Sequence, residues 1–213
     1  MFGERGATSR EDRWSGRAHG FGCEVGPVQE KVEIALMLHC EARRAARRTG
    51  NGEYVPISEQ DTQAWNRRQL EEADGLLTIA AARGRPARFQ LEAAVQSAHA
   101  QRARSGSVSW PAIALLYEGL VQVAPTYGAL IGRAAAVAQV SGPAAALGLL
   151  DAISDSAVQA YQPYWAARAH FLTGLGRRDE ARLAYERASQ LTEDVAVRRF
   201  LSSAQSELGD TSA

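Results

Sequence analysis

The sequence has few of the residues that mark several common classes of protein. Its 213 residues include one lysine, Lys31, and two cysteines, Cys23 and Cys40. Two cysteines cannot build a disulfide framework or a four-cysteine zinc site. Lys and Arg together number 24, as do Asp and Glu. The chain therefore has no net charge that would draw it onto nucleic acid or an anionic membrane.

Long apolar runs are also missing. The longest uncharged stretch, residues 134–150, is interrupted by Gly142 and Pro143. It is shorter than the roughly 20 apolar residues that cross a bilayer, and the first residues lack the apolar core of a signal peptide. We expect no membrane segment and a cytoplasmic location.

The chain divides into a short tail and a helical region. Residues 1–27 are rich in Gly, Arg and Glu and show no apolar period, which predicts a disordered tail. A helical domain is predicted over 28–210. Its first helix places Val32, Leu36, His39 and Arg43 on one stripe.

Turn and cap residues divide this region further. The Gly50–Gly52 segment predicts a tight turn. Ser58 is then a candidate N-cap for a helix that contains Trp65 and ends at Gly84 and Pro86. A further helix is predicted over 87–104. No segment shows the alternating, β-branched pattern of a strand.

A 34-residue spacing recurs in the second half. Tyr117, Asp151 and Tyr185 are 34 residues apart, as are Gly142 and Gly176. This is the period of tetratricopeptide (TPR) repeats, each a pair of helices. We predict an all-α fold in which antiparallel helix pairs stack as a short TPR-like solenoid. The predicted repeats lie near 94–127, 128–161 and 162–195, and a capping helix covers 194–208.

Catalytic signatures are weak. The chain contains no HExxH motif, nucleophile elbow or phosphate-binding glycine loop. His99 and His170 lie on alanine-rich helices and are expected to be buried or half-buried. His39, Cys40 and Glu41 could bind a metal together with Cys23, but neighbouring helix residues point about 100° apart. We therefore expect no enzyme activity, no metal and no cofactor.

The basic segment 43–48 is the sharpest charge feature and has two interpretations. It either complements the helix dipole or forms an arginine patch that pairs with carboxylates. The acidic cluster of Glu71, Glu72 and Asp74 is interpreted as a solvated face. Trp65 is either a core residue or the anchor of a contact surface. The candidates for protein interaction are Arg43, Arg44, Glu59, Asp61 and Trp65.

Six segments together resemble the C-terminal, TPR-like extension of a class of extracytoplasmic-function RNA polymerase sigma factors. They are ALMLHCEARRAAR (35–47), SEQDTQAWNR (58–67), RFQLEAAVQSAHA (88–100), the W..I..LYEGL segment (110–120), RAAAVAQVSGPAAALGLLDAI (133–153) and YWAARAHFLTGLGRRDEARLAYERA (164–188).

The resemblance implies a helical regulatory module that is attached to a sigma factor. Sigma regions two and four lie upstream in such proteins, and residues 1–27 do not resemble them. We therefore expect an orphan C-terminal domain, a fragment or half of a split gene. Gly132 stands where the family favours asparagine, and a glycine within a helix costs about 1 kcal/mol.

Three functional hypotheses follow. The first is a protein-interaction module for sigma or polymerase surfaces, without direct nucleic-acid or membrane binding. In it, replacing Trp65 and Arg43 by alanine weakens partner binding without unfolding the chain. The second is a free-standing TPR adaptor unrelated to transcription. The third, an enzyme, would require His99, His170 and a carboxylate to meet in one pocket.

Overall fold

The computed structural model describes residues 27–82 and 87–209, and over these residues the chain is helical without a strand. The expected tail, residues 1–27, lies outside them except for Pro27, where the first helix begins. Gly84 and Pro86 lie outside them too. The α-helices are α1 (Pro27–Glu41), α2 (Arg67–Ala81), α3 (Arg88–Ala100), α4 (Arg102–Ser105), α5 (Trp110–Val123), α6 (Tyr127–Ser141), α7 (Pro143–Asp151), α8 (Gln162–Gly174), α9 (Arg178–Gln190) and α10 (Val195–Glu207).

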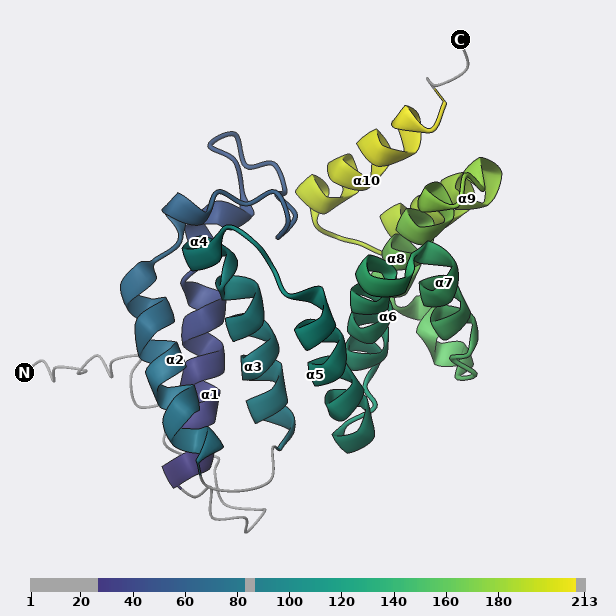
Figure 1. The fold of residues 1–213 in the computed structure, drawn as a ribbon. Coiled ribbons are helices and arrows are strands. Elements are labelled where there is room, and N and C mark those ends of the chain that lie inside the picture. The colour runs from purple at the N-terminus through teal and green to yellow at the C-terminus, as the bar shows by residue number, and fades with distance from the viewer. Residues whose placement is uncertain (1–26, 83–86, 210–213) are drawn as a thin grey trace, which may run out of the picture.

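The helices pack against their neighbours in a curved stack (Figure 1). α1 contacts both α2 and α3, α3 contacts α5, and from α5 to α10 each helix contacts the next. The prediction of an all-α fold of stacked helices is confirmed. The largest core cluster lies in the second half, where Ala169, Phe171 and Ala181 are buried between α8, α9 and their neighbours.

The two glycines of the 34-residue pattern occupy equivalent turns. Gly142 joins α6 to α7 with φ +87°, and Gly176 joins α8 to α9 with φ +71°. Glycine adopts these left-handed angles without steric cost. The second and third predicted repeats each contain one helix pair. α3, however, begins at Arg88, ahead of the first predicted repeat.

The segment between α1 and α2 differs from its prediction. Ser58 does not cap a helix. Asp61 caps the short 3-10 helix Thr62–Ala64, and Asn66 caps α2 by accepting a hydrogen bond from the Gln69 backbone N–H at 3.2 Å. Trp65 lies between the two helices in extended backbone. This break allows the indole to enter the core, which one continuous helix from Ser58 would not.

The predicted turn at Gly50–Gly52 is confirmed. The Gly52 N–H donates to the Thr49 carbonyl at 2.9 Å, and Gly52 has φ +80°. The chain then returns antiparallel to itself, with an isolated bridge between Arg48 and Tyr54. The loop reaches across to α10 (Figure 1), where Arg48 forms an ion pair with Asp194.

Candidate functional site

Trp65 has two arginine side chains over its ring. It is 3% exposed, and the guanidinium carbons of Arg43 and Arg102 lie 5.9 and 5.2 Å from its ring centroid. Guanidinium groups stack favourably on an indole face. We call Arg43, Trp65 and Arg102 the arginine–tryptophan cluster. It joins the turn after α1 and helix α4 to the segment that precedes α2.

Arg102 also holds the preceding loop in place. Its guanidinium donates to the Ser58 carbonyl and, at 2.5 Å, to the Gln60 carbonyl. The Gln60 amide donates in turn to the Val55 carbonyl at 3.2 Å. The charge of Arg102 is therefore solvated by backbone carbonyls, since it forms no ion pair among the described residues.

Arg43 is 8% exposed and likewise has no carboxylate partner in the described part of the chain. Its Nε donates to the His39 carbonyl at 3.3 Å, and its Nη2 donates to Oε1 of Gln96 on α3. Burial lowers the pKa of Arg43. An arginine nevertheless stays charged in proteins, so a positive charge lies beneath Gln96.

A second polar cluster joins α1, α2 and α3, and sequence reasoning missed it. His39 is fully buried, with Nε2 3.4 Å from Asp74 Oδ1. The Ser97 hydroxyl donates to the same carboxylate at 2.6 Å, and Arg104 pairs with its other oxygen. Burial lowers the pKa of His39, and the Asp74 charge opposes that shift.

Asp74 was therefore misinterpreted as part of a solvated face. Glu71 and Glu72 are exposed, but Asp74 is half-buried. The available signal was its spacing of four residues from Leu70 and three from Leu77, which puts it on the apolar side of α2.

The two remaining described histidines lie in separate places. His99 packs edge-on against Trp110, with ring centroids 5.5 Å apart, and its pKa is lowered to about 4, first by burial and then by Arg43 and Arg102. His170 is exposed, contrary to the prediction, and lines a cleft beside α10. The pocket that an enzyme hypothesis required, with His99 and His170 together, does not form.

The five predicted interaction residues do not form one patch. Arg43 and Trp65 are buried against their own chain. Arg44 is 77% exposed and pairs with Glu41 at 2.7 Å, while the Asp61 carboxylate accepts from the Gln63 N–H at 2.8 Å. Glu59 lines the cleft beside α10. Only the last three are available for direct contact, and the interaction role of all five stays a prediction.

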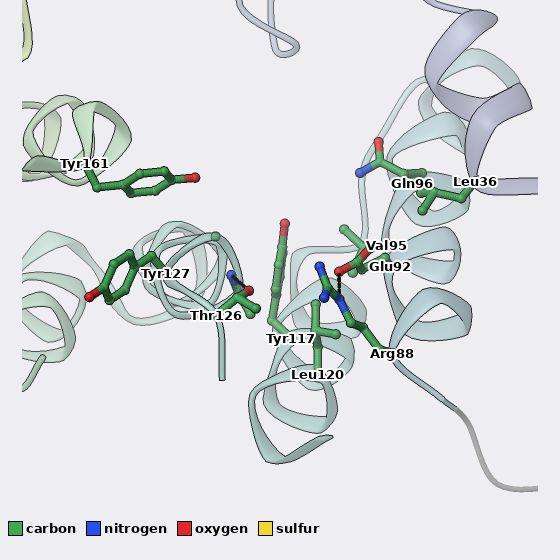
Figure 2. Close-up of a pocket in the computed structure, with 12 residues that line it drawn as sticks. Leu36, Arg88, Glu92, Val95, Gln96, Tyr117, Leu120, Thr126, Tyr127 and Tyr161 are labelled. Atoms are coloured by element: carbon green, nitrogen blue, oxygen red, sulfur yellow. Dashed lines mark hydrogen bonds and ion pairs between the residues drawn. The ribbon is translucent and has the colours of Figure 1, made fainter. Parts of the chain in front are cut away.

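A groove of about 480 Å³ lies between the two halves of the stack. We call this cavity the central groove. Figure 2 shows side chains from α3, α5 and α6 around it, with Tyr161 from the start of α8 on the far side. Arg88 and Glu92 form an ion pair of 2.8 Å on its α3 wall. Tyr117 stands at its centre.

The polar atoms of the central groove are only partly engaged. The Tyr127 hydroxyl points away from the groove and donates to Asp155. The hydroxyls of Tyr117 and Tyr161 point into it (Figure 2), and neither has a hydrogen-bond partner within the described residues. Burial and the nearby Glu92 carboxylate raise the pKa of Tyr117, so its hydroxyl stays protonated.

Residues 27–82 and 87–209 contain neither a candidate metal site nor a candidate membrane span. No group of three His, Cys, Asp or Glu side chains there could hold a metal ion. Cys23, one of the candidates considered, lies outside these residues. None of the helices in these ranges has the length and apolar character to cross a bilayer.

Comparisons with known proteins give two matches. Residues 30–81 match DUF6596, a family of unknown function. This segment carries Arg43, Trp65 and both ends of the His39–Asp74 contact. An uncharacterised protein of Rhizobium meliloti (strain 1021) is 32% identical over 167 residues. The match covers 78% of this chain but 39% of that relative. No solved structure matches.

Proposed function

We propose that this chain is a non-catalytic protein-interaction and regulatory module, similar to the C-terminal extension of a sigma-70-family sigma factor and acting in the control of transcription initiation in the cytoplasm. The observation that carries the proposal is the central groove. A stack of helix pairs surrounds it, and the hydroxyls of Tyr117 and Tyr161, which point into it, have no hydrogen-bond partner among the described residues. Stacked helix pairs characteristically present such concave surfaces to partners.

The resemblance to sigma-factor extensions supports the choice of partner. Its segments 88–100 and 110–120 correspond to most of α3 and α5, which line the groove. Its segments 35–47 and 58–67 contain Arg43 and Trp65 of the arginine–tryptophan cluster. The Rhizobium meliloti relative is much longer than the matched region. This is consistent with a helical module that works beside other domains.

Binding would rest on surface complementarity. The groove supplies aromatic area and hydrogen-bonding groups, and Arg44, Glu59 and Asp61 supply exposed charge outside it. Aromatic side chains at the centre of a contact usually carry most of its energy. The equal numbers of acidic and basic residues give no general attraction to nucleic acid.

The test uses the full chain and two matched glycine variants. Gly128 lines the central groove, and Gly148 lies on α7 with open space around it. Gly128→Phe would fill the groove, whereas Gly148→Phe would place the same side chain on an unrelated surface. Binding is measured by calorimetry against core RNA polymerase and against sigma regions two and four from the same organism.

We expect the wild-type chain to bind one of these probes, with Gly128→Phe weakening binding at least about tenfold. Gly148→Phe should bind as the wild type does. No binding to any probe, or equal loss in both variants, contradicts the proposal.

A free-standing TPR adaptor is the second candidate. It is favoured by the generality of the fold, because stacked helix pairs serve many unrelated pathways. The match to a family of unknown function adds no link to transcription. A genome neighbourhood without a sigma-factor gene directly upstream would favour the adaptor, as would failure of all three transcription probes.

A further inference from the structure

The buried charge of Arg43 fixes the orientation of the Gln96 side chain. A guanidinium group only donates hydrogen bonds, so the Gln96 atom that faces Arg43 must be the carbonyl oxygen. The amide nitrogen of Gln96 is then turned toward the central groove, on the side that faces Tyr117 (Figure 2). It has no acceptor among the described residues. Arg43 therefore presents a donor to the groove without lining it.

The hydroxyl of Tyr117 is a second donor directed into the same space. Its ring stands at the centre of the groove, and its oxygen points toward the region between Gln96 and Tyr161 (Figure 2). Tyr161 contributes a third donor, also a hydroxyl, from the opposite wall. These groups come from α3, α5 and the start of α8, so one occupant could contact all three.

The electrostatic environment favours an acceptor with negative charge. Arg88 and Glu92 pair with each other on the wall of the groove, and at Tyr117 the positive charge of Arg43 opposes the effect of Glu92. Arg43 has no carboxylate partner in the described residues, and neither does Arg102, which also lies over the Trp65 ring. The positive charge of Arg43 is screened weakly because this side chain is 8% exposed. A carboxylate in the groove would supply the counter-charge that this chain does not.

We propose that the central groove binds an extended acidic peptide segment of a partner protein, in which an Asp or Glu carboxylate accepts hydrogen bonds from the Gln96 amide and the Tyr117 hydroxyl. Charge-assisted hydrogen bonds of this kind are about twice as strong as neutral ones. The inference rests on the proposed function as an interaction module and names the chemistry of its partner.

The experiment compares three fluorescein-labelled peptides that differ only at two central positions: Asp-Glu, Asn-Gln and Lys-Lys. Binding to the full chain is measured by fluorescence anisotropy. We expect the acidic peptide to bind at least about tenfold more tightly than the amide peptide, and the basic peptide to bind weakest.

Gln96→Glu is the decisive variant. It keeps an oxygen for Arg43 and so preserves the fold, but it replaces the amide donor with a second acceptor. Binding of the acidic peptide should fall at least about tenfold, and thermal unfolding should show a melting temperature no lower than that of the wild type. The matched control is Gln139→Glu, an exposed position on α6, which should bind as the wild type does.

Three results would overturn the inference: equal affinity for the acidic and amide peptides, unchanged affinity in Gln96→Glu, or displacement of the acidic peptide by an equal concentration of inorganic phosphate. The last would show a general anion site. If Gly128→Phe loses polymerase or sigma binding but the three peptides bind with equal affinity, the proposed function holds and only this inference fails. If the acidic peptide binds but no transcription probe does, the proposed function fails alone.

Discussion

The ring of Tyr117 lies against the backbone of Gly132, with no room between them for a side chain. A Cβ atom at position 132 would fall 2.4 Å from Cε1 and Cζ of that ring. The glycine thus lets α5 and α6 approach closely and fixes Tyr117 upright in the central groove. Its role is packing, which compensates for the helix stability that glycine costs.

Gly132→Ala should therefore destabilise the protein, although alanine is the better helix former by about 1 kcal/mol. The added methyl group must displace a ring that is held between α3, α5 and α6, and overpacking of this kind costs about 1–3 kcal/mol. The measurement is the free energy of unfolding in urea. The displaced ring should also weaken acidic-peptide binding.

A double-mutant cycle isolates the cause. In a Tyr117→Ala background, Gly132→Ala should be neutral or stabilising because the clash is gone, which gives a coupling energy of about 1 kcal/mol or more. Equal effects in both backgrounds would place the cost elsewhere in α6.

Trp65→Ala should cause a much larger loss. The indole is 3% exposed and is contacted by Arg43 and Arg102, and truncating a buried tryptophan costs about 3–5 kcal/mol. Leu115→Ala, at a side chain 75% exposed, is the control and should change stability little. Urea unfolding gives both values. A Trp65→Ala variant as stable as the wild type would restore the alternative of a surface anchor.

Much of the fold could be predicted because the repeat constrains many positions at once. Ala169, Ala181, Tyr185 and Ala188 are buried as their register requires, and Gly176 adopts the turn angle that glycine allows. The stripe from Val32 to Arg43 likewise faces the core, with Leu36 half-buried.

The start of α2 could not be predicted because three residues offer good caps. Ser58, Asp61 and Asn66 all satisfy the local rule. The choice is made by Trp65, whose burial requires extended backbone just before the helix. The predicted burial of His170 was wrong for a related reason, because an alanine-rich helix gives little contrast between its buried and exposed faces.

The groove depends on contacts that no local pattern encodes. Gln96, Tyr117 and Tyr161 line one groove only because α3, α5 and the residue that caps α8 surround the same space. The same holds for His39 and Asp74, which are joined by the pairing of α1 with α2. Arg43 lies on the predicted apolar stripe, but it was interpreted as part of a basic surface segment, and the structure shows it buried.

Replacement of Asp194 should loosen the start of α10 and its attachment to the loop before α2. Asp194 pairs with Arg48 and also caps α10 by accepting from the Ala196 N–H at 2.9 Å. Asp194→Ala removes both interactions, whereas Asp194→Asn keeps a capping oxygen and removes the charge. Amide hydrogen exchange across 195–207 should rise about fivefold in Asp194→Ala and less in Asp194→Asn.

Arg48→Ala tests the ion pair alone and should resemble Asp194→Asn, since exposed pairs contribute little. Tyr54, which packs edge-on against Phe200 at 5.3 Å, would still hold the loop to α10. Exchange that rises equally in all three variants would assign the whole effect to the ion pair.

Stability should decline as the pH falls below neutrality, because the folded chain holds His99 uncharged. Burial and the charges of Arg43 and Arg102 lower its pKa to about 4, against about 6.5 in the unfolded chain. The unfolded state then binds more protons between these values, so the free energy of unfolding is fully present above about pH 6.5 and falls toward about pH 4. His99 alone would account for roughly 3 kcal/mol of that loss. His39, whose pKa is also lowered, adds to this loss of stability in the same direction.

Urea unfolding at about pH 7 and about pH 4.5 measures how the free energy of unfolding depends on pH. His99→Phe, which keeps a ring against Trp110, should remove most of that dependence. A slope unchanged in His99→Phe would mean that His99 is solvated in the folded protein and that the two unpaired arginines do not act on it.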